Sequence, residues 1–263
     1  MLSYQHGYHA GNMADVHKHA ILASALDLMC ARDKPFSYIE THAGRGLYRL
    51  DAPEALKTGE AAAGIDRAEA AFDPDHPYLR LLAAVRALHG PRAYPGSPLI
   101  ATLMLRPEDR VHLAELHPAE HAALARLMQD YGIRPRHEDG FAMARAVCPP
   151  TPRRGMLMID PSYEIKTDFE RLPPLVQAIA RKWNVGVLMV WFPLLSDGTG
   201  QALGKALMAL GLPKSHLSLA RFGAARPGHR MVGSGMFVAN APWGLAEAMQ
   251  TAEAAIAAAI AGR

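Results

Sequence analysis

The chain has 263 residues, of which 50% are hydrophobic and 20% charged, and its formal net charge is +3. This length and composition provide for one large packed domain and exclude an intrinsically disordered protein. The small positive excess is compatible with a polyanionic partner but does not by itself indicate one.

The two cysteines, Cys30 and Cys148, are far apart and form no CxxC or CxxH spacing. This argues against a disulfide framework and favours a reducing compartment. No apolar run approaches the roughly 18 residues that a membrane span needs, and the N-terminus lacks the basic and apolar regions of a secretory signal. We therefore expect a cytoplasmic protein.

The first elements of the chain are a helix and a strand. Residues 17–31 carry an apolar stripe that is typical of a helix, and residues 36–40 read as a short strand. The strand runs into residues 41–46, Thr-His-Ala-Gly-Arg-Gly, whose glycines let the backbone approach a ligand closely. Arg49 stands where a dinucleotide fingerprint needs a third glycine, which argues against an NAD-dependent enzyme.

Residues 51–95 interrupt the alternation of strands and helices. They contain two amphipathic helical patterns, at 60–71 and 78–88. We interpret this stretch as a helical insertion subdomain within a single domain that spans residues 1–263. Its placement makes it a candidate lid. The helix that the insertion delays is expected directly after it, with Ser97 as its N-cap.

Alternation resumes after the insertion. We expect strands at 110–116, 133–138, 156–159, 185–192, 215–222 and 236–240, and helices at 98–105, 118–131, 141–147, 169–182, 200–210 and 245–261. With the first strand this predicts an α/β fold with a mostly parallel, seven-stranded sheet covered on both faces. The last two strands have no helix between them and are expected to form a terminal antiparallel pair. That is the layout of the methyltransferase variant of the Rossmann-like fold.

Four of the expected strands end beside an acidic residue: Glu40, Glu115, Asp139 and Asp160. A single acid at such a position is usually a capping residue. The carboxyl ends of parallel strands share one rim, however, and ligands bind there. Four acids on that rim could bind ribose hydroxyls, an adenine amino group and a cationic sulfonium. The acid after the second strand suits the ribose, and Asp139 suits the adenine amine.

Residues 156–163, Met-Leu-Met-Ile-Asp-Pro-Ser-Tyr, contain the most informative of these strand ends. The buried strand stops at Asp160 because Pro161 cannot continue a ladder and favours an extended residue before it. A carboxylate, the Pro161 carbonyl and the ring of Tyr163 are thereby placed together. We hypothesise that this loop grips the amino group of a nucleobase.

Several motifs resemble a known family. Residues 160–163 are similar to the (Asn/Asp)-Pro-Pro-(Tyr/Phe/Trp) loop of adenine-N6 methyltransferases. The N-terminal block and residues 41–46 together resemble the bacterial 23S ribosomal RNA adenine-N6 methyltransferases of the RlmJ family. That block contains Tyr4, His6, His9, Ala10, Gly11, Asn12, Asp15, Lys18 and His19. Further matches are Tyr94 to Pro98, Glu115 to Pro118, Asp139 to Phe141 and Ser234 to Met236.

The resemblance implies a class I methyltransferase that transfers a methyl group from S-adenosylmethionine to N6 of a specific adenine in 23S rRNA. The implied catalytic residues are Asp160, Pro161 and Tyr163. The implied cofactor contacts are His19, His42, Ser97, Glu115, Asp139, Gly140 and Asp160. Tyr4, His6 and Lys18 would approach the RNA or the target base, within or just after a substrate-facing tail at residues 1–15.

The chain departs from the family loop at Ser162, which replaces the second proline. The expected acceptors of the amino group are the Asp160 carboxylate and the Pro161 carbonyl, and neither is affected. The replacement loosens the loop, so it puts in question how rigidly Tyr163 is held.

The N-terminal histidines could instead be metal ligands. His17 and His19 point to different sides of a helix, and no cysteine stands near them. We therefore expect no metal. The other expected partners are 23S rRNA before full ribosome assembly and no membrane, with the protein acting as a monomer.

Basic residues flank the expected turn between the last two strands: Arg221, Arg226, His229 and Arg230. If this turn lies at the active rim, its cations could bind phosphates of a nucleic acid. The turn is therefore a candidate RNA contact.

Two alternatives remain open at the level of sequence. A DNA adenine-N6 methyltransferase is disfavoured because residues 51–95 are too few for a target-recognition domain. A non-catalytic RNA-binding protein of the same fold is disfavoured because the acceptors at Asp160 and Pro161 are intact.

Overall fold

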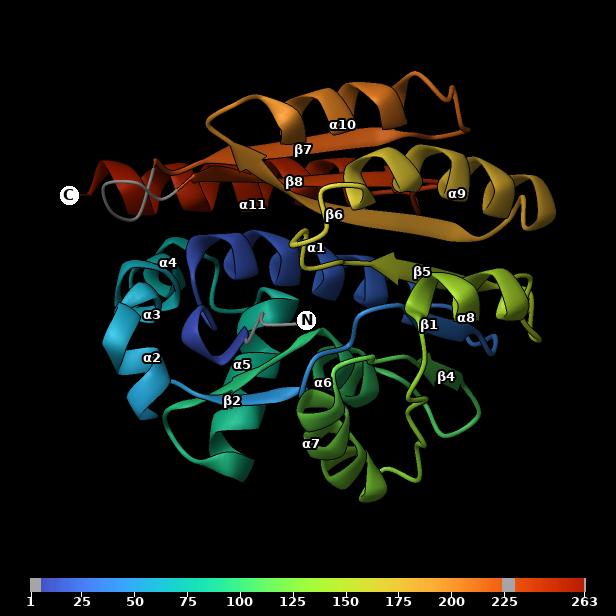
Figure 1. Cartoon of the computed structure of the whole chain (residues 1–263). Helices are drawn as coiled ribbons and strands as arrows, with labels where there is room; N and C mark the ends of the chain where they lie inside the picture. Colours follow the sequence, from blue (N-terminus) through green and yellow to red (C-terminus); the bar gives the residue numbers. More distant parts are fainter. Residues whose placement is uncertain (1–5, 224–229, 263) are drawn as a thin grey trace.

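The computed structural model describes residues 6–223 and 230–262, and a six-stranded sheet lies at its centre (Figure 1). In spatial order the strands are β4 (Arg110–Leu113), β1 (Ser37–Glu40), β5 (Gly155–Ile159), β6 (Val187–Leu195), β8 (Met231–Ala239) and β7 (His216–Arg221). Five of these strands run in the same direction, and β8 runs opposite to them. The Rossmann-like α/β fold, with a mostly parallel sheet and a terminal antiparallel pair, is confirmed.

The central sheet has one strand fewer than predicted. Residues 133–138, expected as a strand, make a single bridge between Ala114 and Arg136. Pro135 has no N–H to donate, so a longer ladder cannot form there. The Arg136 N–H donates to the Leu113 carbonyl at 2.8 Å, and the segment still runs beside β4.

Helices cover both faces of the sheet. One face carries α1 (Met13–Cys30), α6 (Ser97–Met104), α7 (Pro118–Gln129) and α11 (Leu245–Ala261), and the other carries α8 (Gly140–Val147), α9 (Asp168–Lys182) and α10 (Thr199–Met208). In Figure 1, β6, β7 and β8 run between α10 and α1. Met156 and Met158 of β5 face the α1 side, whereas Leu157 and Ile159 face the other, as the two-residue period of a strand requires. Within the described chain, no helix combines the length and apolarity needed to cross a membrane.

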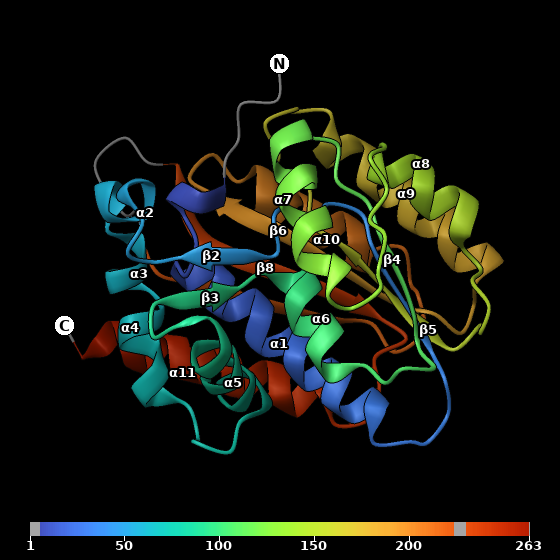
Figure 2. The same ribbon diagram turned by 90° about the horizontal axis from the view of Figure 1, so that it is seen from below.

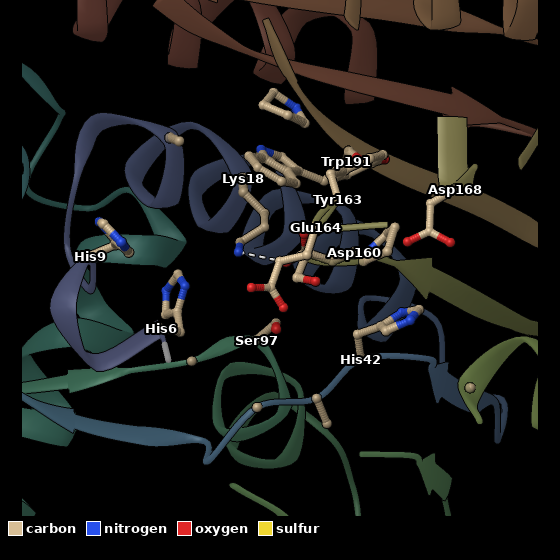
Figure 3. Close-up of a pocket in the computed structure, with 18 of the residues that line it drawn as sticks. His6, His9, Lys18, His42, Ser97, Asp160, Tyr163, Glu164, Asp168 and Trp191 are labelled. Atoms are coloured by element: carbon tan, nitrogen blue, oxygen red, sulfur yellow. Dashed lines mark hydrogen bonds and ion pairs between the residues drawn. The ribbon is translucent and has the colours of Figure 1, made fainter. Parts of the chain in front are cut away.

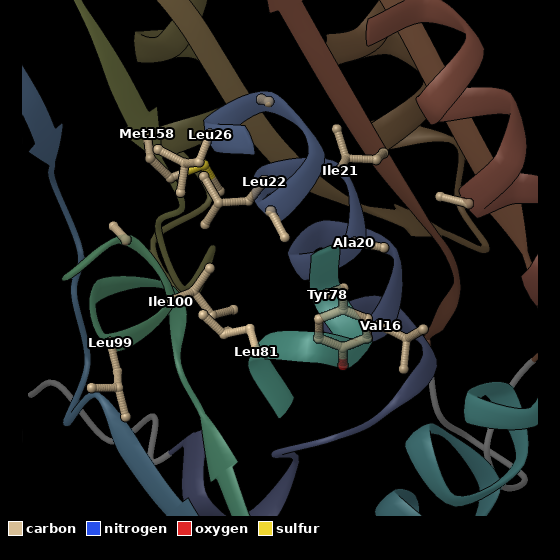
Figure 4. Close-up of a cluster of buried hydrophobic side chains, with 14 of the residues drawn as sticks. Val16, Ala20, Ile21, Leu22, Leu26, Tyr78, Leu81, Leu99, Ile100 and Met158 are labelled. Carbon is tan, nitrogen blue, oxygen red and sulfur yellow. The ribbon is translucent and has the colours of Figure 1, made fainter. Parts of the chain in front are cut away.

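Helix α1 is the centre of the larger core. It begins at Met13, four residues before the predicted start, and every residue from there to Leu26 is buried. Figure 4 shows that α1 is packed on more than one side. Leu22 and Leu26 lie towards Met158 of the sheet. Val16 and Ala20 lie near Tyr78 of the insertion. A helix enclosed on all sides has to be apolar around most of its circumference.

The insertion at 51–95 packs against this helix. It consists of α2 (Pro53–Thr58), α3 (Glu60–Ala63), α4 (Ile65–Ala68), the 3₁₀ turn η2 (Glu69–Ala71), α5 (Pro77–His89) and β3 (Ala93–Pro95). Figure 2 shows these elements gathered beside α1 and α11. The helix predicted at 60–71 is broken at Gly64, where a Cβ would lie 2.1 Å from the Gly11 carbonyl oxygen. A role as a lid remains a prediction.

A second, two-stranded sheet was not predicted. It pairs β3 antiparallel with β2 (Leu47–Arg49), directly after the glycine-rich turn. Each strand has three residues, too few for a two-residue hydrophobic period to stand out from the sequence. The pair ties both ends of the insertion to the same place in the fold.

Candidate active site

A cavity of about 540 Å³ opens at the carboxyl ends of the parallel strands (Figure 3). It is bounded by the loops after β1, β4 and β5, by the first turns of α1 and by the last half of β6. Among its lining residues are all the predicted site residues that the structure describes: His6, Lys18, His19, His42, Ser97, Glu115, Asp139, Gly140, Asp160, Pro161 and Tyr163. Tyr4 lies outside the described residues.

Lys18 connects α1 to the loop that follows β5. Its Nζ lies 2.6 Å from Oδ2 of Asp160 and 3.1 Å from Oδ1 of Asp15, and Figure 3 shows it reaching towards Asp160. The other oxygen of Asp15 lies 2.8 Å from Nε2 of His6 and accepts from the Gly11 N–H at 2.9 Å. We call this set of side chains, His6, Asp15, Lys18 and Asp160, the charge network.

The charge network is largely buried, and its charges shift the pKa values of Lys18 and Asp15. Burial works against the charge of Lys18, but Asp160 and Asp15 outweigh it and raise the pKa of the ammonium. Burial likewise opposes ionisation of Asp15, yet the charges of His6 and Lys18 hold its pKa well below the usual range. Removing any one charge therefore leaves a buried partner uncompensated.

Asp15 was assigned no role from the sequence, although it is central to this network. Asn12 is the N-cap of α1, with its side chain accepting from the Asp15 N–H at 2.9 Å. The spacing of three residues from Asn12 to Asp15 and from Asp15 to Lys18 places all three on one side of the first turns. That spacing is the signal that could have identified Asp15.

The loop from Asp160 to Tyr163 is well anchored despite Ser162. Tyr163 has φ of +57°, in the left-handed region. Its ring lies 4.5 Å from that of Phe169 and 5.9 Å from that of Trp191, centroid to centroid, and its hydroxyl donates to the Trp191 carbonyl at 2.5 Å. These contacts hold the aromatic ring without a second proline.

On the opposite side of the cavity, Glu115 holds the glycine-rich turn. Its Oε2 accepts from the Gly44 N–H at 2.8 Å, and its Oε1 accepts from the His117 N–H at 2.7 Å. Gly44 has φ of +62°, which favours glycine. The carboxylate predicted to bind a ribose is therefore fixed by two backbone groups, and each oxygen keeps a second lone pair for a ligand.

The neighbouring loop brings Asp139 and Gly140 against the end of β1. Asp139 is the N-cap of α8 and accepts from the Ala142 N–H at 2.9 Å. A Cβ at Gly140 would lie 1.8 Å from the Thr41 carbonyl oxygen, so only glycine permits this approach. Burial lowers the pKa of His42 to about 4, and the neutral ring packs edge-on against Phe141 at 5.0 Å.

Glu40 lies beneath the cavity as a buried carboxyl group. It accepts hydrogen bonds from Ser97 and, at 3.0 Å, from the hydroxyl of Tyr38. Burial raises its pKa to about 8, and the nearby charge of Asp160 acts in the same direction. Ser97 is the first residue of α6 rather than its N-cap, which is Gly96, so its hydroxyl is engaged by Glu40 instead of by the helix.

His19 offers the cavity an unengaged nitrogen. Its Nδ1 lies 3.0 Å from the Tyr94 hydroxyl, whereas its buried Nε2 has no hydrogen-bond partner within the described part of the chain. Burial lowers the pKa of this imidazole to about 3, so the ring is neutral. A buried polar atom without a partner is costly, and a bound ligand would relieve that cost.

The rim also carries basic residues. Arg230, directly before β8, lines the cavity and pairs with Asp197, so this end of β8 lies at the rim. Arg221 ends β7, while Arg226 and His229 lie outside the described residues. Arg171 of α9 lies 4.9 Å from the centroid of the Phe141 ring. Across residues 6–223 and 230–262, no group of three or more His, Cys, Asp or Glu side chains is arranged to hold a metal ion.

Comparisons with known proteins agree with this geometry. A family model described as ribosomal RNA large subunit methyltransferase D, RlmJ, matches residues 33–263. Ribosomal RNA large subunit methyltransferase J of Escherichia coli is 37% identical over 255 residues, which cover 95% of this chain and 90% of that protein. The protein of the same name from Haemophilus influenzae is 36% identical over 259 residues, with 95% and 91% covered.

A solved structure shares the whole architecture. The protein LPL1258 of Legionella pneumophila superposes with a TM-score of 0.85 at 28% sequence identity, covering 96% of this chain and 94% of that one. Together with the family model and the two relatives, this shows that the chain belongs to the RlmJ family of ribosomal RNA large subunit methyltransferases.

Proposed function

We propose that this enzyme transfers a methyl group from S-adenosylmethionine to the N6 amino group of a specific adenine in 23S ribosomal RNA. The observation that carries the proposal is the Asp160–Pro161 pair at the end of β5, which lies in the cavity with the carboxylate already oriented by Lys18. Membership of a ribosomal RNA methyltransferase family supports the substrate class.

The residues on the Glu115 side of the cavity fit the cofactor. Glu115 suits ribose hydroxyls, Asp139 suits an adenine amine, and the Gly140 backbone allows close approach at the end of β1. The unpartnered Nε2 of His19 supplies a further polar contact. When bound, S-adenosylmethionine supplies an electrophilic methyl group, and the acidic rim suits its positive charge.

The chain's own contribution to transfer is orientation and hydrogen bonding. An adenine amino group is a poor nucleophile because its lone pair is delocalised into the ring. The Asp160 carboxylate and the Pro161 carbonyl can each accept one amino hydrogen, which localises the lone pair and aims it across the cavity. Because Lys18 fixes Oδ2 of Asp160, the carboxylate is oriented before the base arrives. The proton that the amine loses can pass to Asp160.

The target base has to leave its stack to reach this depth. We assign Tyr163 to stack on the extruded base, and Tyr4, His6 and Lys18 to approach the base or the RNA. We further propose that the enzyme is a monomer, that it acts in the cytoplasm and that it modifies the RNA before ribosome assembly is complete.

Comparing substrates tests the proposal. The purified protein is incubated with S-adenosylmethionine carrying a labelled methyl group and with protein-free 23S rRNA, assembled large subunits or duplex DNA. We expect label in the protein-free rRNA and none in the DNA. Label in DNA alone would favour the DNA methyltransferase alternative, and label in neither, without cofactor binding by calorimetry, would favour a non-catalytic RNA-binding protein.

A further inference from the structure

One buried polar feature is not used by the proposed chemistry. His17 lies between Asp15 and Lys18 on α1 but does not line the cavity. Its Nδ1 is 2.9 Å from the Ser234 hydroxyl and its Nε2 is 2.8 Å from the Ser218 hydroxyl. All three side chains are almost inaccessible, at 0%, 0% and 1% exposure. Ser234 also belongs to the Ser-Gly-Met motif that resembles the family, for which the site offers no role.

The two serines extend this contact in opposite directions. The hydroxyl of Ser234 accepts from the indole N–H of Trp191 at 2.8 Å. The hydroxyl of Ser218 donates at 2.5 Å to the carboxylate of Glu253, on the C-terminal helix α11. Five side chains from α1, β6, β7, β8 and α11 thus form one continuous chain of hydrogen bonds, which we call the buried relay.

The proton arrangement of the buried relay is determined by its two ends. An indole N–H can only donate, and an ionised carboxylate can only accept. The hydroxyl of Ser234 therefore donates to Nδ1 of His17, and Nε2 of His17 donates to Ser218. Burial lowers the pKa of His17 to about 3, which agrees with a neutral ring carrying its proton on Nε2. Each donor in the chain has one acceptor.

Trp191, where the relay ends, contacts two residues of the candidate active site, Lys18 and Tyr163. The Nζ of Lys18 lies 5.3 Å from the centroid of its ring, a cation–π arrangement. Its backbone carbonyl accepts from the Tyr163 hydroxyl, and its ring flanks the tyrosine ring. Figure 3 shows Trp191 beside Lys18 and Tyr163, with Asp160 next to them.

We propose that Trp191 is a positioning residue of the site and that the buried relay sets the orientation of its indole. The inference rests on the proposed function and deepens it. Lys18 orients Asp160, and Tyr163 is assigned to the target base, so a rotated indole would displace both groups that flank the reacting amine. A displacement of 1 Å can cost as much as about 100-fold in rate.

The relay also explains polar residues in a core that could otherwise be apolar. A satisfied buried network adds little net stability compared with well-packed apolar side chains, but it defines one geometry. A solely structural relay predicts loss of stability without a specific loss of turnover. A positioning relay predicts a loss of turnover that depends on Trp191.

A double-mutant cycle separates these two roles. Ser234→Ala and Ser218→Ala each break the relay, and Trp191→Phe removes the N–H while keeping an aromatic face for Lys18. We expect kcat on protein-free 23S rRNA to fall roughly tenfold in Ser234→Ala and less in Ser218→Ala, with KM for S-adenosylmethionine unchanged. In the Trp191→Phe background we expect neither serine substitution to lower kcat further.

Ser215→Ala is the matched control. Its hydroxyl also donates a hydrogen bond, at 2.7 Å to the Leu212 carbonyl, but it lies outside the relay. We expect it to leave kcat unchanged. Melting temperatures of all variants show whether any loss of turnover reflects unfolding.

An NMR measurement tests the geometry without catalysis. The ¹⁵N-labelled ammonium of Lys18 lies over the Trp191 ring, so its resonance should shift in Ser234→Ala and Ser218→Ala but not in Ser215→Ala. Unshifted Lys18 signals, or an equal loss of kcat with and without the indole, would overturn the inference. A wild-type protein that methylates no RNA would contradict the proposed function instead, and the Lys18 resonance would still decide whether the relay positions the site.

Discussion

The two sides of the cavity are built in different ways. On the side that we propose binds the cofactor, which we call the cofactor side, Glu115 and Asp139 accept hydrogen bonds from backbone N–H groups of their own loops and, for Glu115, of Gly44 in the loop after β1. On the other side, Lys18 and Asp160 are held by each other across 142 residues of sequence, in a largely buried network of charges. The first side depends on where the strands end, whereas the second depends on the buried ion pairs of Lys18 with Asp15 and Asp160. Substitutions on the cofactor side should therefore mainly weaken binding of S-adenosylmethionine, whereas substitutions in the charge network should lower both stability and turnover.

Asp160→Ala should have the largest effect. Loss of the carboxylate removes an acceptor of the amino group and the main partner of Lys18, so kcat should fall by roughly 10³-fold. Single-turnover methylation measures this, and calorimetry with S-adenosylmethionine should show a much smaller change in affinity. Asp160→Asn, which keeps the shape and one oxygen, checks that the loss is not due to misfolding. A kcat close to that of the wild type in both variants would remove Asp160 from the mechanism.

Asp15→Asn tests the charge network at its centre. We expect the free energy of unfolding to fall by about 3 kcal/mol, because the buried Lys18 and His6 lose a partner. Methyl transfer should fall roughly 10- to 100-fold as Lys18 loses its fixed position. Denaturant unfolding and steady-state kinetics measure the two effects.

Asp27→Asn is the control on the same helix. Asp27 pairs with Arg80, and both side chains are about half exposed, at 50% and 53%. Such a pair contributes less than about 1 kcal/mol. If the two substitutions had equal effects on stability and turnover, the network would not be the buried, coupled unit described above.

Gly140→Ala tests the cofactor side by steric means. The added Cβ would lie 1.8 Å from the Thr41 carbonyl oxygen, so α8 must move away from the end of β1. Overpacking of this kind costs about 1–3 kcal/mol, and we expect the Kd for S-adenosylmethionine to rise roughly tenfold. Gly132→Ala provides the comparison, since Gly132 has φ of +68° with nothing within 4 Å of an added Cβ. It should lower stability by about 1 kcal/mol and leave the Kd unchanged.

The pH dependence of stability should show the smallest effect. Burial lowers the pKa values of His17, His19 and His42 from 6.5 to about 3, 3 and 4. Below pH 6.5 the unfolded chain takes up protons at these rings and the folded protein does not, so the free energy of unfolding falls as the pH drops. The pKa of Glu40 rises from 4.5 to about 8, so its contribution is full below 4.5 and is lost as the pH rises through 8. Unfolding free energy should therefore be greatest near pH 6.5.

Urea denaturation at pH 5.5, 6.5 and 8 measures this profile. Between pH 6.5 and 8 the decline due to Glu40 should be at most about 2 kcal/mol. Glu40→Gln, which keeps the shape of the side chain, should flatten that decline. It should also steepen the loss of stability between pH 6.5 and 5.5 by about 1 kcal/mol, because protonated Glu40 opposes that loss in the wild type. A decline of the same size in the variant would mean that Glu40 is ionised in the folded protein.

The two sides also differ in how far they could be predicted from sequence. Strand ends are local features, so the positions of Glu115, Asp139 and Asp160 on one rim followed from the alternation of strands and helices. The contact between Lys18 and Asp160 is not local, and only the resemblance to a family associated Lys18 with the site. The partners of Asp15 lie close by in sequence, between His6 and Lys18, but its role was missed because the pairing of Lys18 with Asp160, which makes Asp15 part of the site, is not local.

The fold likewise divides into local features that the sequence predicts and packing between distant segments that it does not. The parallel strands were foreseen from runs of apolar residues, whereas residues 133–138 failed to become a strand because Pro135 limits pairing to one bridge. The β2–β3 sheet and the all-round burial of α1 depend on how the insertion packs, which no local pattern encodes. The relay through His17 could not be predicted either, since it joins five elements that meet only in the folded chain.

Nucleoside mass spectrometry of methylated 23S rRNA tests the central claim most directly. After incubation of a protein-free transcript with the wild-type enzyme and S-adenosylmethionine, the digest should contain N6-methyladenosine at one position, and the Asp160→Ala reaction should contain almost none. A methyl group on another base, on another atom of adenine or on ribose would contradict the assignment of Asp160 and Pro161 as acceptors of an adenine amino group.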